Sequence, residues 1–409
     1  MDHRPYARRA RGMSAPVIRR HTYGSRGDGV PPFIGVVAAD RVASLVNVND
    51  VVCVVKRNDV SVARSRGDYG AILTDWKSDE APAWIGALSR PTLFGAEHLE
   101  HLNDGDIVRL DFSRGLARTL YRVGSEHNTI FITDQCNSNC LMCSQPPKDI
   151  DDSHLVQEHL RLVRLIPPTT GTLGITGGEP SLFGSGLVSV IQACKEHLPL
   201  TRLHMLTNGR TFCDRDWAQE FGAVQHPDLV LGVPLYSDVA WQHDYVVQAA
   251  GAFTQTMLGL HNLARFGVRL EIRVVVHQQT ASHLLRLAQF IYRNLPFAEH
   301  VAFMGLEMMG YTKTNLKNLW IDPVDYQDSL REALLFLDRA GMHVSIYNHQ
   351  LCVLPRALWP YARKAISDYK NVYLDECAAC AVLDQCGGLF KSGERIHSAH
   401  IRSIKALSV

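Results

Sequence analysis

A regular alternation of strand-like runs and helical patterns between residues 129 and 306 constrains the fold of this chain more than any other feature. The runs that read as strands are residues 129–133, 172–176, 202–207, 229–235, 269–276 and 301–306. Strands separated by helices pair in parallel, because each crossover helix returns the chain to the same edge of the sheet. We therefore predict an α/β fold with a partial (β/α)6 TIM-type barrel, whose functional groups gather at the carboxyl ends of the strands.

Two helices of this region have clear limits in the sequence. Residues 282–295 carry an apolar stripe at helical spacing. Farther on, Asp322 can cap a helix, Pro323 fits its first turn, and Gly341 can end it. One more strand is predicted at residues 343–347.

Three cysteines, Cys136, Cys140 and Cys143, follow the first predicted strand with the spacing Cys-x3-Cys-x2-Cys. A loop of this length can place three thiolates at three corners of a [4Fe–4S] cluster. Structural metal sites normally have four protein ligands, so three ligands leave one metal position open for a cofactor or substrate. A zinc site completed by a distant His or Cys is the alternative that the spacing leaves open.

The second predicted strand ends in a Gly-Gly-Glu-Pro turn made of Gly177, Gly178, Glu179 and Pro180. The two glycines allow backbone to approach a bound group closely. Glu179 offers an acceptor for the amino group of such a ligand. Taken alone, these residues are equally compatible with an ordinary turn.

A second cysteine group lies near the carboxyl terminus and consists of Cys352, Cys377, Cys380 and Cys386. Four ligands indicate a closed site, which could hold an auxiliary [4Fe–4S] cluster or a structural zinc ion. The other three cysteines stand alone in the sequence and are expected to be small buried hydrophobic residues. The remaining histidines show no ligand-like pairing, and we assign them no chemistry.

Composition narrows the class of protein. The chain has 409 residues, 46% of them hydrophobic, which suits two or three folded units. A net charge of +1 gives no electrostatic case for a nucleic-acid partner. No apolar run reaches the roughly 20 residues that span a bilayer, and no secretory signal is recognisable. Because most cysteines are grouped, metal ligation in a reducing, cytoplasmic setting is the better interpretation.

The chain divides into four predicted regions. Residues 1–30 are rich in arginine and predict a basic flexible tail, with a nucleic-acid arm or organelle presequence as alternatives. Residues 31–124 carry short β-rich runs and predict a small β-containing N-terminal domain. Residues 125–342 hold the partial barrel, and residues 343–409 form a C-terminal cysteine-rich cluster domain.

The cysteine loop and the Gly-Gly-Glu-Pro turn, which begins 34 residues after Cys143, together resemble the two signature motifs of the radical S-adenosylmethionine (SAM) superfamily. This resemblance implies that the loop binds a [4Fe–4S] cluster, that SAM chelates its open iron, and that reductive cleavage of SAM gives a 5′-deoxyadenosyl radical. It also implies SAM contacts from the Gly-Gly-Glu-Pro turn. Met142 stands where the family often has an aromatic residue, and its thioether can pack on the adenine.

Polar residues at four other strand ends are further candidates for SAM contacts. Asn208 closes the third strand, as in many similar proteins, and Ser237 follows the fourth, where similar proteins bind the SAM ribose or carboxylate. Arg273 lies on the fifth strand and could pair with a carboxylate. Glu307 ends the sixth strand near the expected adenine site. An ordinary turn or core role is the alternative for each residue.

The second cysteine group resembles the shortened, twitch form of the SPASM domain found in radical SAM peptide maturases. The full pattern has one more cysteine near position 390, where this chain has Phe390, so the resemblance implies one auxiliary cluster rather than two. A closer likeness is to the His-Xaa-Ser system radical SAM maturase of bacteria. The segments that carry it are residues 131–147, 304–310, 319–326 and 346–354.

The closer resemblance implies a peptide or protein substrate with His-Xaa-Ser repeats, modified after hydrogen abstraction. It also implies partner proteins of the same maturation system and an external electron donor. Two other functions remain open on the residues alone. One is a radical SAM enzyme that modifies RNA or a small metabolite, and the other is a non-catalytic iron–sulfur or zinc protein acting as a sensor or scaffold.

Overall fold

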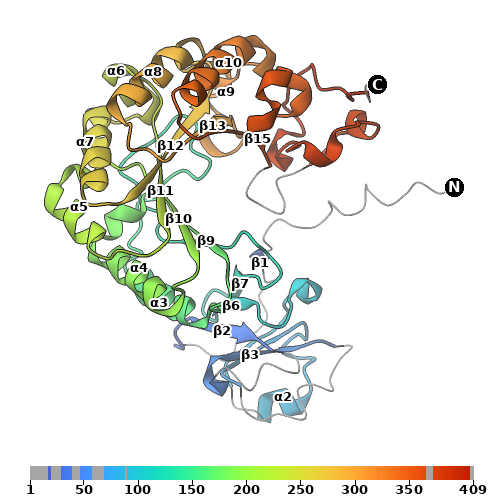
Figure 1. Cartoon of the computed structure of the whole chain (residues 1–409). Coiled ribbons are helices and arrows are strands. Elements are labelled where there is room, and N and C mark those ends of the chain that lie inside the picture. The colour runs from blue at the N-terminus through green and yellow to red at the C-terminus, as the bar shows by residue number, and fades with distance from the viewer. Residues whose placement is uncertain are drawn as a thin grey trace.

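The structure is a computed structural model that describes residues 17–19, 29–38, 47–57, 69–87, 90–364 and 372–405. Two sheets organise it (Figure 1): a mixed sheet near the amino terminus and a curved parallel sheet that follows it in the chain. Of the predicted basic tail, residues 17–19 and 29–30 are described, and Val17–Arg19 form strand β1. The rest of the tail lies outside the described residues.

The curved sheet has eight strands in the order β15-β14-β13-β12-β11-β10-β9-β8, and every neighbouring pair is parallel. Its strands are β8 (Thr129–Phe131), β9 (Thr172–Thr176), β10 (Arg202–Leu206), β11 (Leu229–Pro234), β12 (Arg269–Val276), β13 (His300–Gly305), β14 (Val344–Tyr347) and β15 (Ala362–Arg363). All six predicted strands are confirmed to within about two residues at each end. The further strand predicted at residues 343–347 is confirmed as β14. Because β14 and the unpredicted β15 continue the same sheet past residue 342, the sheet has two strands more than the six expected for the barrel.

Helices cover the outer face of this sheet, as Figure 1 shows. They are α3 (Leu155–Leu165), α4 (Ser185–His197), α5 (Arg215–Gly222), α6 (Ala240–Val247), α7 (Ala252–Arg265), α8 (Leu284–Asn294) and α10 (Pro323–Arg339). The one-turn helix α9 (Leu316–Leu319) lies apart from this layer, and its Leu319 packs in an apolar cluster with Met142. The caps of α10 are confirmed: the Asp322 side chain accepts from the Val324 amide, and Gly341 takes a positive φ of 81° just past its end.

The two faces of the curved sheet differ in chemistry because side chains alternate along each strand. On β12, Leu270, Ile272 and Val274 are fully buried against the helices. Glu271 and Arg273 alternate with them and point to the concave face. The lumen of the partial barrel is therefore polar, unlike the packed apolar interior of a closed barrel.

The N-terminal sheet has the order β1-β7-β6-β2-β3-β4-β5. Its strands after β1 are β2 (Phe33–Val37), β3 (Val51–Val55), β4 (Ala71–Thr74), β5 (Thr92–Leu93), β6 (Ile107–Asp111) and β7 (Leu116–Tyr121), with the short helix α2 (Ala83–Ala87) between β4 and β5. Strands β2 to β5 are parallel, whereas β6 and β7 pair antiparallel.

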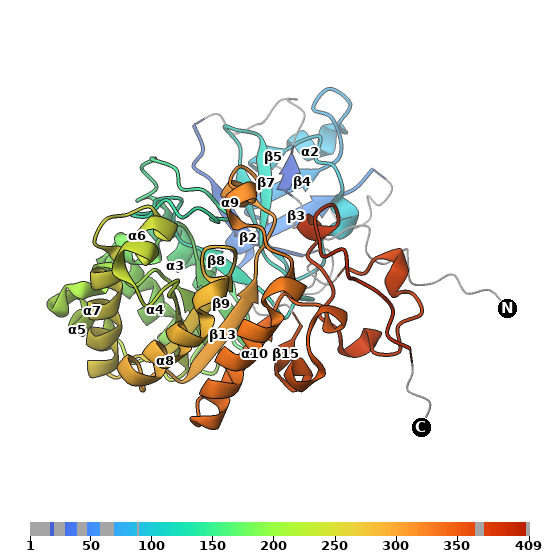
Figure 2. The same ribbon diagram turned by 90° about the horizontal axis from the view of Figure 1, so that it is seen from above.

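This N-terminal sheet is fixed to the barrel. Ile34 and Tyr121 belong to the same apolar core as the barrel strands and helices. The Arg109 guanidinium also donates two hydrogen bonds, of 2.7 and 3.0 Å, to the Glu158 carboxylate on α3. Seen from above in Figure 2, the N-terminal sheet lies beside the β8 edge, and the C-terminal region beside β15.

The C-terminal region after β15 is built from turns rather than long elements. Its short 3-10 helices are Asp375–Cys377, Leu383–Gln385 and Lys391–Gly393, and Val372 and Leu389 form an isolated bridge. Within the described part of the chain, no helix has both the length and the apolar character needed to cross a membrane.

Candidate functional site

The first cysteine loop lies at the carboxyl end of β8 and is held by backbone hydrogen bonds from two sides. On one side the amides of Asn139 and Leu141 donate to Val247 and Val246 at the end of α6, over 3.0 and 2.9 Å. On the other side the Tyr311 amide donates to the Cys143 carbonyl over 2.8 Å. The loop therefore has one defined conformation set by the connections after β11 and β13.

Gly310 shows why the segment after β13 needs a glycine. Its φ is 52°, and an added Cβ would lie 2.1 Å from the Cys143 carbonyl oxygen. The nearby Asn315 side chain donates to the Leu141 carbonyl over 2.9 Å. The segment 304–310, singled out in the sequence, thus ends directly against the cysteine loop.

Met142 anchors the loop by packing. Its side chain is 8% exposed and lies in an apolar cluster with Tyr236, Val246 and Leu319. The sequence offers this thioether as an adenine contact. In the structure its visible role is to hold the loop onto the body of the barrel, and Cys140 packs against the same apolar cluster.

Burial acts on all three thiols of the loop. It raises the pKa of Cys136 to about 11 and of Cys140 to about 12, and it also raises the pKa of Cys143. Thiols in such surroundings are neutral at pH 7, so a bound metal would have to supply the positive charge that stabilises their thiolates. A positively charged cluster of irons fits this requirement.

The spacing of the thiols tests which metal group fits. Ligand sulfurs around one tetrahedral zinc ion lie about 3.8 Å apart, given a Zn–S bond of about 2.3 Å. Among the described residues, only His98, Glu100 and His101 bring three ligand atoms within 4.8 Å of one another. Neither cysteine group brings three sulfurs that close together in the described part of the chain. The chemistry of the first loop, three thiols with no fourth cysteine in the loop, fits a [4Fe–4S] cluster with one open iron.

The Gly-Gly-Glu-Pro turn packs directly onto the chain leading into the cysteine loop. The amides of Gly178 and Glu179 donate to the carbonyls of Thr133 and Gln135 over 2.6 and 2.7 Å. A Cβ at Gly178 would lie 2.1 Å from the Gln135 oxygen, and one at Gly177 would lie 2.7 Å from the Thr133 oxygen. From the sequence we expected the small size of Gly178 to let a cofactor come close to the backbone. In the structure the group that lies close to Gly178 is the backbone of Gln135, the residue before Cys136.

This contact predicts that Gly178→Ala disturbs the cysteine loop itself. The methyl group would meet backbone, which cannot rotate away, so the loop or the turn must shift. We expect anaerobically purified Gly178→Ala to lose most of the iron bound by the first cysteine group. Gly171→Ala is the matched control, because a Cβ there meets nothing within 4 Å. Equal iron content in both variants would contradict this role for Gly178.

Glu179 is fully buried and joins the ends of β9 and β10. Its carboxylate accepts from the Ser181 amide and hydroxyl over 3.0 and 2.6 Å. It also accepts from the Thr207 hydroxyl over 2.6 Å and from the Asn208 amide over 2.5 Å. Burial raises its pKa, and these hydrogen bonds oppose that rise. Pro180 is buried at the start of the following 3-10 helix, Pro180–Phe183.

Asn208 reaches the cysteine loop from the end of β10. Its side-chain amide donates to the Asn137 side chain over 2.6 Å and lies 3.9 Å from the Cys136 sulfur. Next to it, the Arg210 guanidinium donates to the Asn137 carbonyl and, over 2.9 Å, to the Ser138 hydroxyl. Arg210 thus brings a positive charge to the loop.

The sequence analysis did not select Arg210. The sequence could have indicated Arg210 by its position, because it stands two residues after Asn208 in the Thr-Asn-Gly-Arg stretch that follows β10. The Arg210 Nε also donates to Gln255 on α7 over 2.8 Å, so the guanidinium is held between α7 and the loop.

The other predicted SAM contacts have partners within the chain. The buried Ser237 hydroxyl donates to Gln242 over 2.7 Å and accepts from the Val239 amide over 3.0 Å. Arg273 donates to the Glu271 carboxylate over 2.8 Å and contacts the Met304 sulfur at 3.0 Å. Glu307 lies in the turn after β13, where its carbonyl accepts from the Met309 amide over 2.9 Å.

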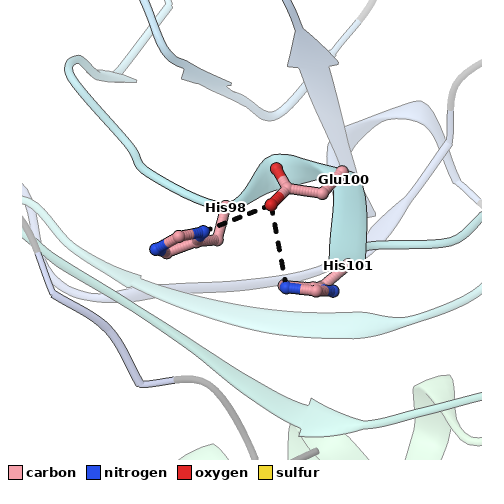
Figure 3. Close-up of side chains that lie close together, drawn as sticks. All are labelled: His98, Glu100 and His101. Carbon is pink, nitrogen blue, oxygen red and sulfur yellow. Dashed lines mark hydrogen bonds and ion pairs between the residues drawn. The ribbon is translucent and has the colours of Figure 1, made fainter. Parts of the chain in front are cut away.

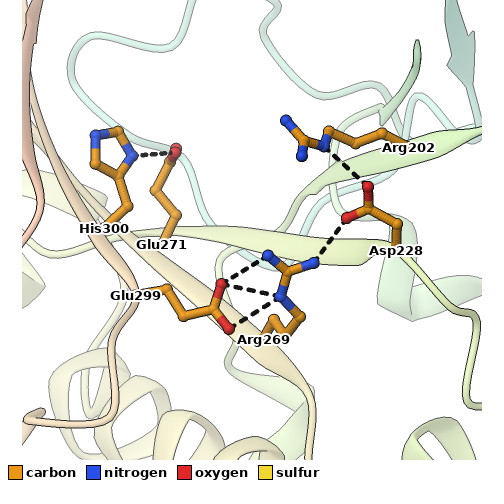
Figure 4. A network of polar contacts seen from close by, with 6 residues as sticks. All are labelled: Arg202, Asp228, Arg269, Glu271, Glu299 and His300. Atoms are coloured by element: carbon orange, nitrogen blue, oxygen red, sulfur yellow. Dashed lines mark hydrogen bonds and ion pairs between the residues drawn. The ribbon is translucent and has the colours of Figure 1, made fainter. Parts of the chain in front are cut away.

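A polar network occupies the lumen of the barrel on the concave face of β10 to β13 (Figure 4). Glu271 lies 2.7 Å from the His300 ring nitrogen and 3.4 Å from that of His204. Burial alone would raise the pKa of Glu271, but these two rings and Arg273 outweigh it and hold that pKa far below its usual value. The carboxylate therefore stays ionised.

Toward the amino ends of the strands, the same face carries a row of alternating charges. Arg202 donates to Asp228 over 3.0 Å (Figure 4). Arg269 donates both to Asp228, over 2.7 Å, and to Glu299, over 2.9 Å. This row ties the strand beginnings together, whereas the ligands of the first cysteine group lie at the opposite ends.

The second cysteine group surrounds a single cavity beside β15. All four cysteines line it, and it is partly open to solvent. The amides of Leu351 and Gly388 each lie 3.5 Å from the Cys386 sulfur, and the Ile404 amide lies 3.4 Å from that of Cys380. Amide donors of this kind stabilise the negative charge of metal-bound thiolates, and in an iron–sulfur cluster they help to set the reduction potential.

A group that the sequence analysis missed is formed by His98, Glu100 and His101 in the N-terminal domain (Figure 3). The Glu100 carboxylate lies 3.2 Å from the His98 ring nitrogen and 3.7 Å from that of His101. All three side chains are largely exposed, and their contacts are with one another. The signal was the His-x-Glu-His spacing around a short 3-10 helix, Leu99–His101.

Comparison with known proteins identifies a family that this region resembles. Residues 130–291 match the family model described as the Radical SAM superfamily. No curated protein matches the chain.

Solved structures that resemble this chain include three of low identity. SuiB of Streptococcus suis is 16% identical, with a TM-score of 0.43 over 53% of this chain and 48% of that one. anSMEcpe with bound AdoMet is 17% identical, with a TM-score of 0.42 over 53% and 62%. Coproporphyrinogen III oxidase (HemN) of Escherichia coli is 13% identical, with a TM-score of 0.40 over 52% of each chain. The alignments thus cover about half of this chain and less than two thirds of each neighbour.

Proposed function

We propose that this chain, whose residues 130–291 match the Radical SAM superfamily model, is an enzyme that reductively cleaves SAM and abstracts hydrogen from a peptide substrate. The observation that carries the proposal is the contact between the loop of Cys136, Cys140 and Cys143 and the Gly-Gly-Glu-Pro turn. The two motifs are far apart in the sequence, yet in the fold they pack against each other at the carboxyl ends of β8 and β9.

The three cysteines of the loop would hold a [4Fe–4S] cluster with one open iron. When bound, the reduced cluster supplies the electron that splits the SAM sulfonium into methionine and a 5′-deoxyadenosyl radical, which takes a hydrogen atom from the substrate. The chain's own contribution is positional. Asn208 and Arg210 fix the loop, and Arg210 places positive charge beside the thiolates. The radical reacts only with groups held against it, so positioning decides which hydrogen is removed.

Support for a peptide substrate comes from the sequence segments that resemble the His-Xaa-Ser system maturase. Three of the four segments include or contact a cysteine of one of the two groups. Residues 131–147 contain the first cysteine loop, residues 304–310 pack against it, and residues 346–354 contain Cys352. We therefore propose a protein with His-Xaa-Ser repeats as substrate, partner proteins of the same system, an external electron donor and a cytoplasmic location.

For the second cysteine group we propose an auxiliary [4Fe–4S] cluster. Four thiols around one cavity suit either iron–sulfur or zinc. What favours the cluster is the resemblance of the second cysteine group to the twitch form of the SPASM domain in radical SAM peptide maturases.

The substrate proposal is tested by co-expressing this chain with a His-Xaa-Ser repeat protein and its candidate partners under anaerobic conditions. We expect mass spectrometry to detect a mass change in the repeat protein that disappears with Cys143→Ala. Cys194→Ala is the control, because that thiol is buried behind the sheet, away from either cysteine group. If the repeat protein stays unmodified while an RNA or a metabolite is changed, the peptide proposal is wrong and the chain is a radical SAM enzyme that modifies RNA or a small metabolite.

A further inference from the structure

The last described residues of the chain, 398–405, lie across the second cysteine cavity. The segment is fixed at its start by Asp322, whose carboxylate accepts from the Ser398 hydroxyl over 2.7 Å and from the Ala399 amide over 3.3 Å. The same carboxylate caps α10 through Val324. The barrel thereby holds the beginning of a segment that ends on the cysteine site.

The far end of the segment donates backbone hydrogen bonds to two thiols. The Ile404 amide lies 3.4 Å from the Cys380 sulfur. The backbone of Arg402 hydrogen-bonds the thiol of Cys352, and both Arg402 and Ile404 line the cavity. The Ile404 carbonyl accepts in turn from the Ala381 amide over 2.9 Å, which pairs the segment with the loop between Cys380 and Cys386.

The charge of the segment agrees with this placement. Its sequence, Ser-Ala-His-Ile-Arg-Ser-Ile-Lys, contains Arg402 and Lys405 and no acidic residue. A cluster held by four thiolates carries net negative charge, which increases when the cluster is reduced. Amide donors and nearby cations stabilise the reduced form more than the oxidised form, so they raise the reduction potential.

We propose that residues 398–405 act as a strap that completes the auxiliary site, with the amides of Arg402 and Ile404 setting the reduction potential of the group held by the second cysteine group. This inference rests on the auxiliary cluster of the proposed function. Arg402 and Ile404 are positioning residues, since they act on the cluster through its thiolate ligands rather than by ligating iron.

The test compares Ile404→Pro with Ile404→Ala by redox titration of the anaerobic full-length protein, followed by electron paramagnetic resonance. Proline removes the amide donor to Cys380, whereas alanine shortens the same side chain and keeps the donor. We expect Ile404→Pro to shift the auxiliary potential to more negative values and to leave that of the first cluster unchanged. Ile404→Ala should keep both potentials. Identical auxiliary potentials in the two variants would overturn the proposal.

A second variant keeps the proposal testable if proline prevents cluster assembly. Ending the chain after Ser398 removes the strap but keeps all four cysteines. We expect its auxiliary cluster to bleach several-fold faster in air than that of the full chain. An unchanged bleaching rate at full iron content would overturn the strap.

Failure of the strap and failure of the proposed function give different results. A full-length protein with zinc and no auxiliary signal at the second site refutes the auxiliary cluster itself. If the auxiliary cluster is present and its reduction potential is the same in Ile404→Pro and Ile404→Ala, only the proposed role of the strap is refuted. The formation of 5′-deoxyadenosine tests the first cluster independently of both outcomes.

Discussion

Cys140→Ala is expected to abolish the formation of 5′-deoxyadenosine from SAM and to remove about four irons from the anaerobically purified protein. Cys140 is the middle ligand of the loop, and two ligands cannot hold a cubane cluster in a fixed position. Its thiol is also the one whose pKa burial raises most within the loop, to about 12. Without iron, the site holds an uncharged thiol pair that has no electron to donate.

The control for this variant is Cys213→Ala. Cys213 follows β10 in the 3-10 helix Thr211–Cys213, and its carbonyl accepts from Asn262 on α7. It therefore lies near the same edge of the barrel but belongs to neither cysteine group. We expect iron content and 5′-deoxyadenosine formation to match those of the unmodified protein. SAM cleavage that survives in Cys140→Ala at an undiminished rate would remove the radical SAM mechanism.

Much of the barrel could be predicted from the sequence because its signals are local. The β12 run from Arg269 to Val276 alternates buried and lumen-facing residues, and its predicted limits agree with the structure. The cap at Asp322 and the positive φ at Gly341 depend on a few neighbouring residues and were predicted in the same way. The count of strands was too low because β15 has only two residues and no periodic pattern.

The candidate site was only partly predictable, because the spacing of cysteines in the sequence identifies metal ligands but not the residues that hold the ligand loop in place. The grouped cysteines are visible in one dimension, whereas Arg210 reaches Ser138 across 72 positions of sequence. The same limit applies to Gly178, whose close neighbour proved to be Gln135 of the chain itself. Contacts of this kind arise from the register of parallel strands, which no single segment encodes.

The lumen network illustrates a second limit. Glu271 could be assigned to a strand, but its ionised state depends on His204 and His300 from the neighbouring strands β10 and β13. Gly232 on β11 leaves space for this network, since a Cβ there would lie 2.9 Å from Cδ of Arg273 and 3.3 Å from the Glu271 carboxylate. The sequence analysis assigned no chemistry to these histidines, because their pairing exists only after the strands align.

The second large effect is expected at the auxiliary site. The double variant Cys377→Ala/Cys380→Ala removes two of the four thiols that line the cavity. If both sites hold [4Fe–4S] clusters, the unmodified protein carries about eight irons and the double variant about four. The first cysteine loop lies at the carboxyl end of β8, at the opposite edge of the sheet from β15, so its cluster should remain.

Retention of the first cluster makes this variant informative about function. We expect the double variant to convert SAM to 5′-deoxyadenosine at a rate close to that of the unmodified protein, while modification of the proposed peptide substrate is lost. Iron analysis, zinc analysis and the two product assays can be made on the same anaerobic sample. A protein with about four irons and one zinc before mutation, which loses only the zinc in the double variant, would assign a structural zinc site to the second cysteine group.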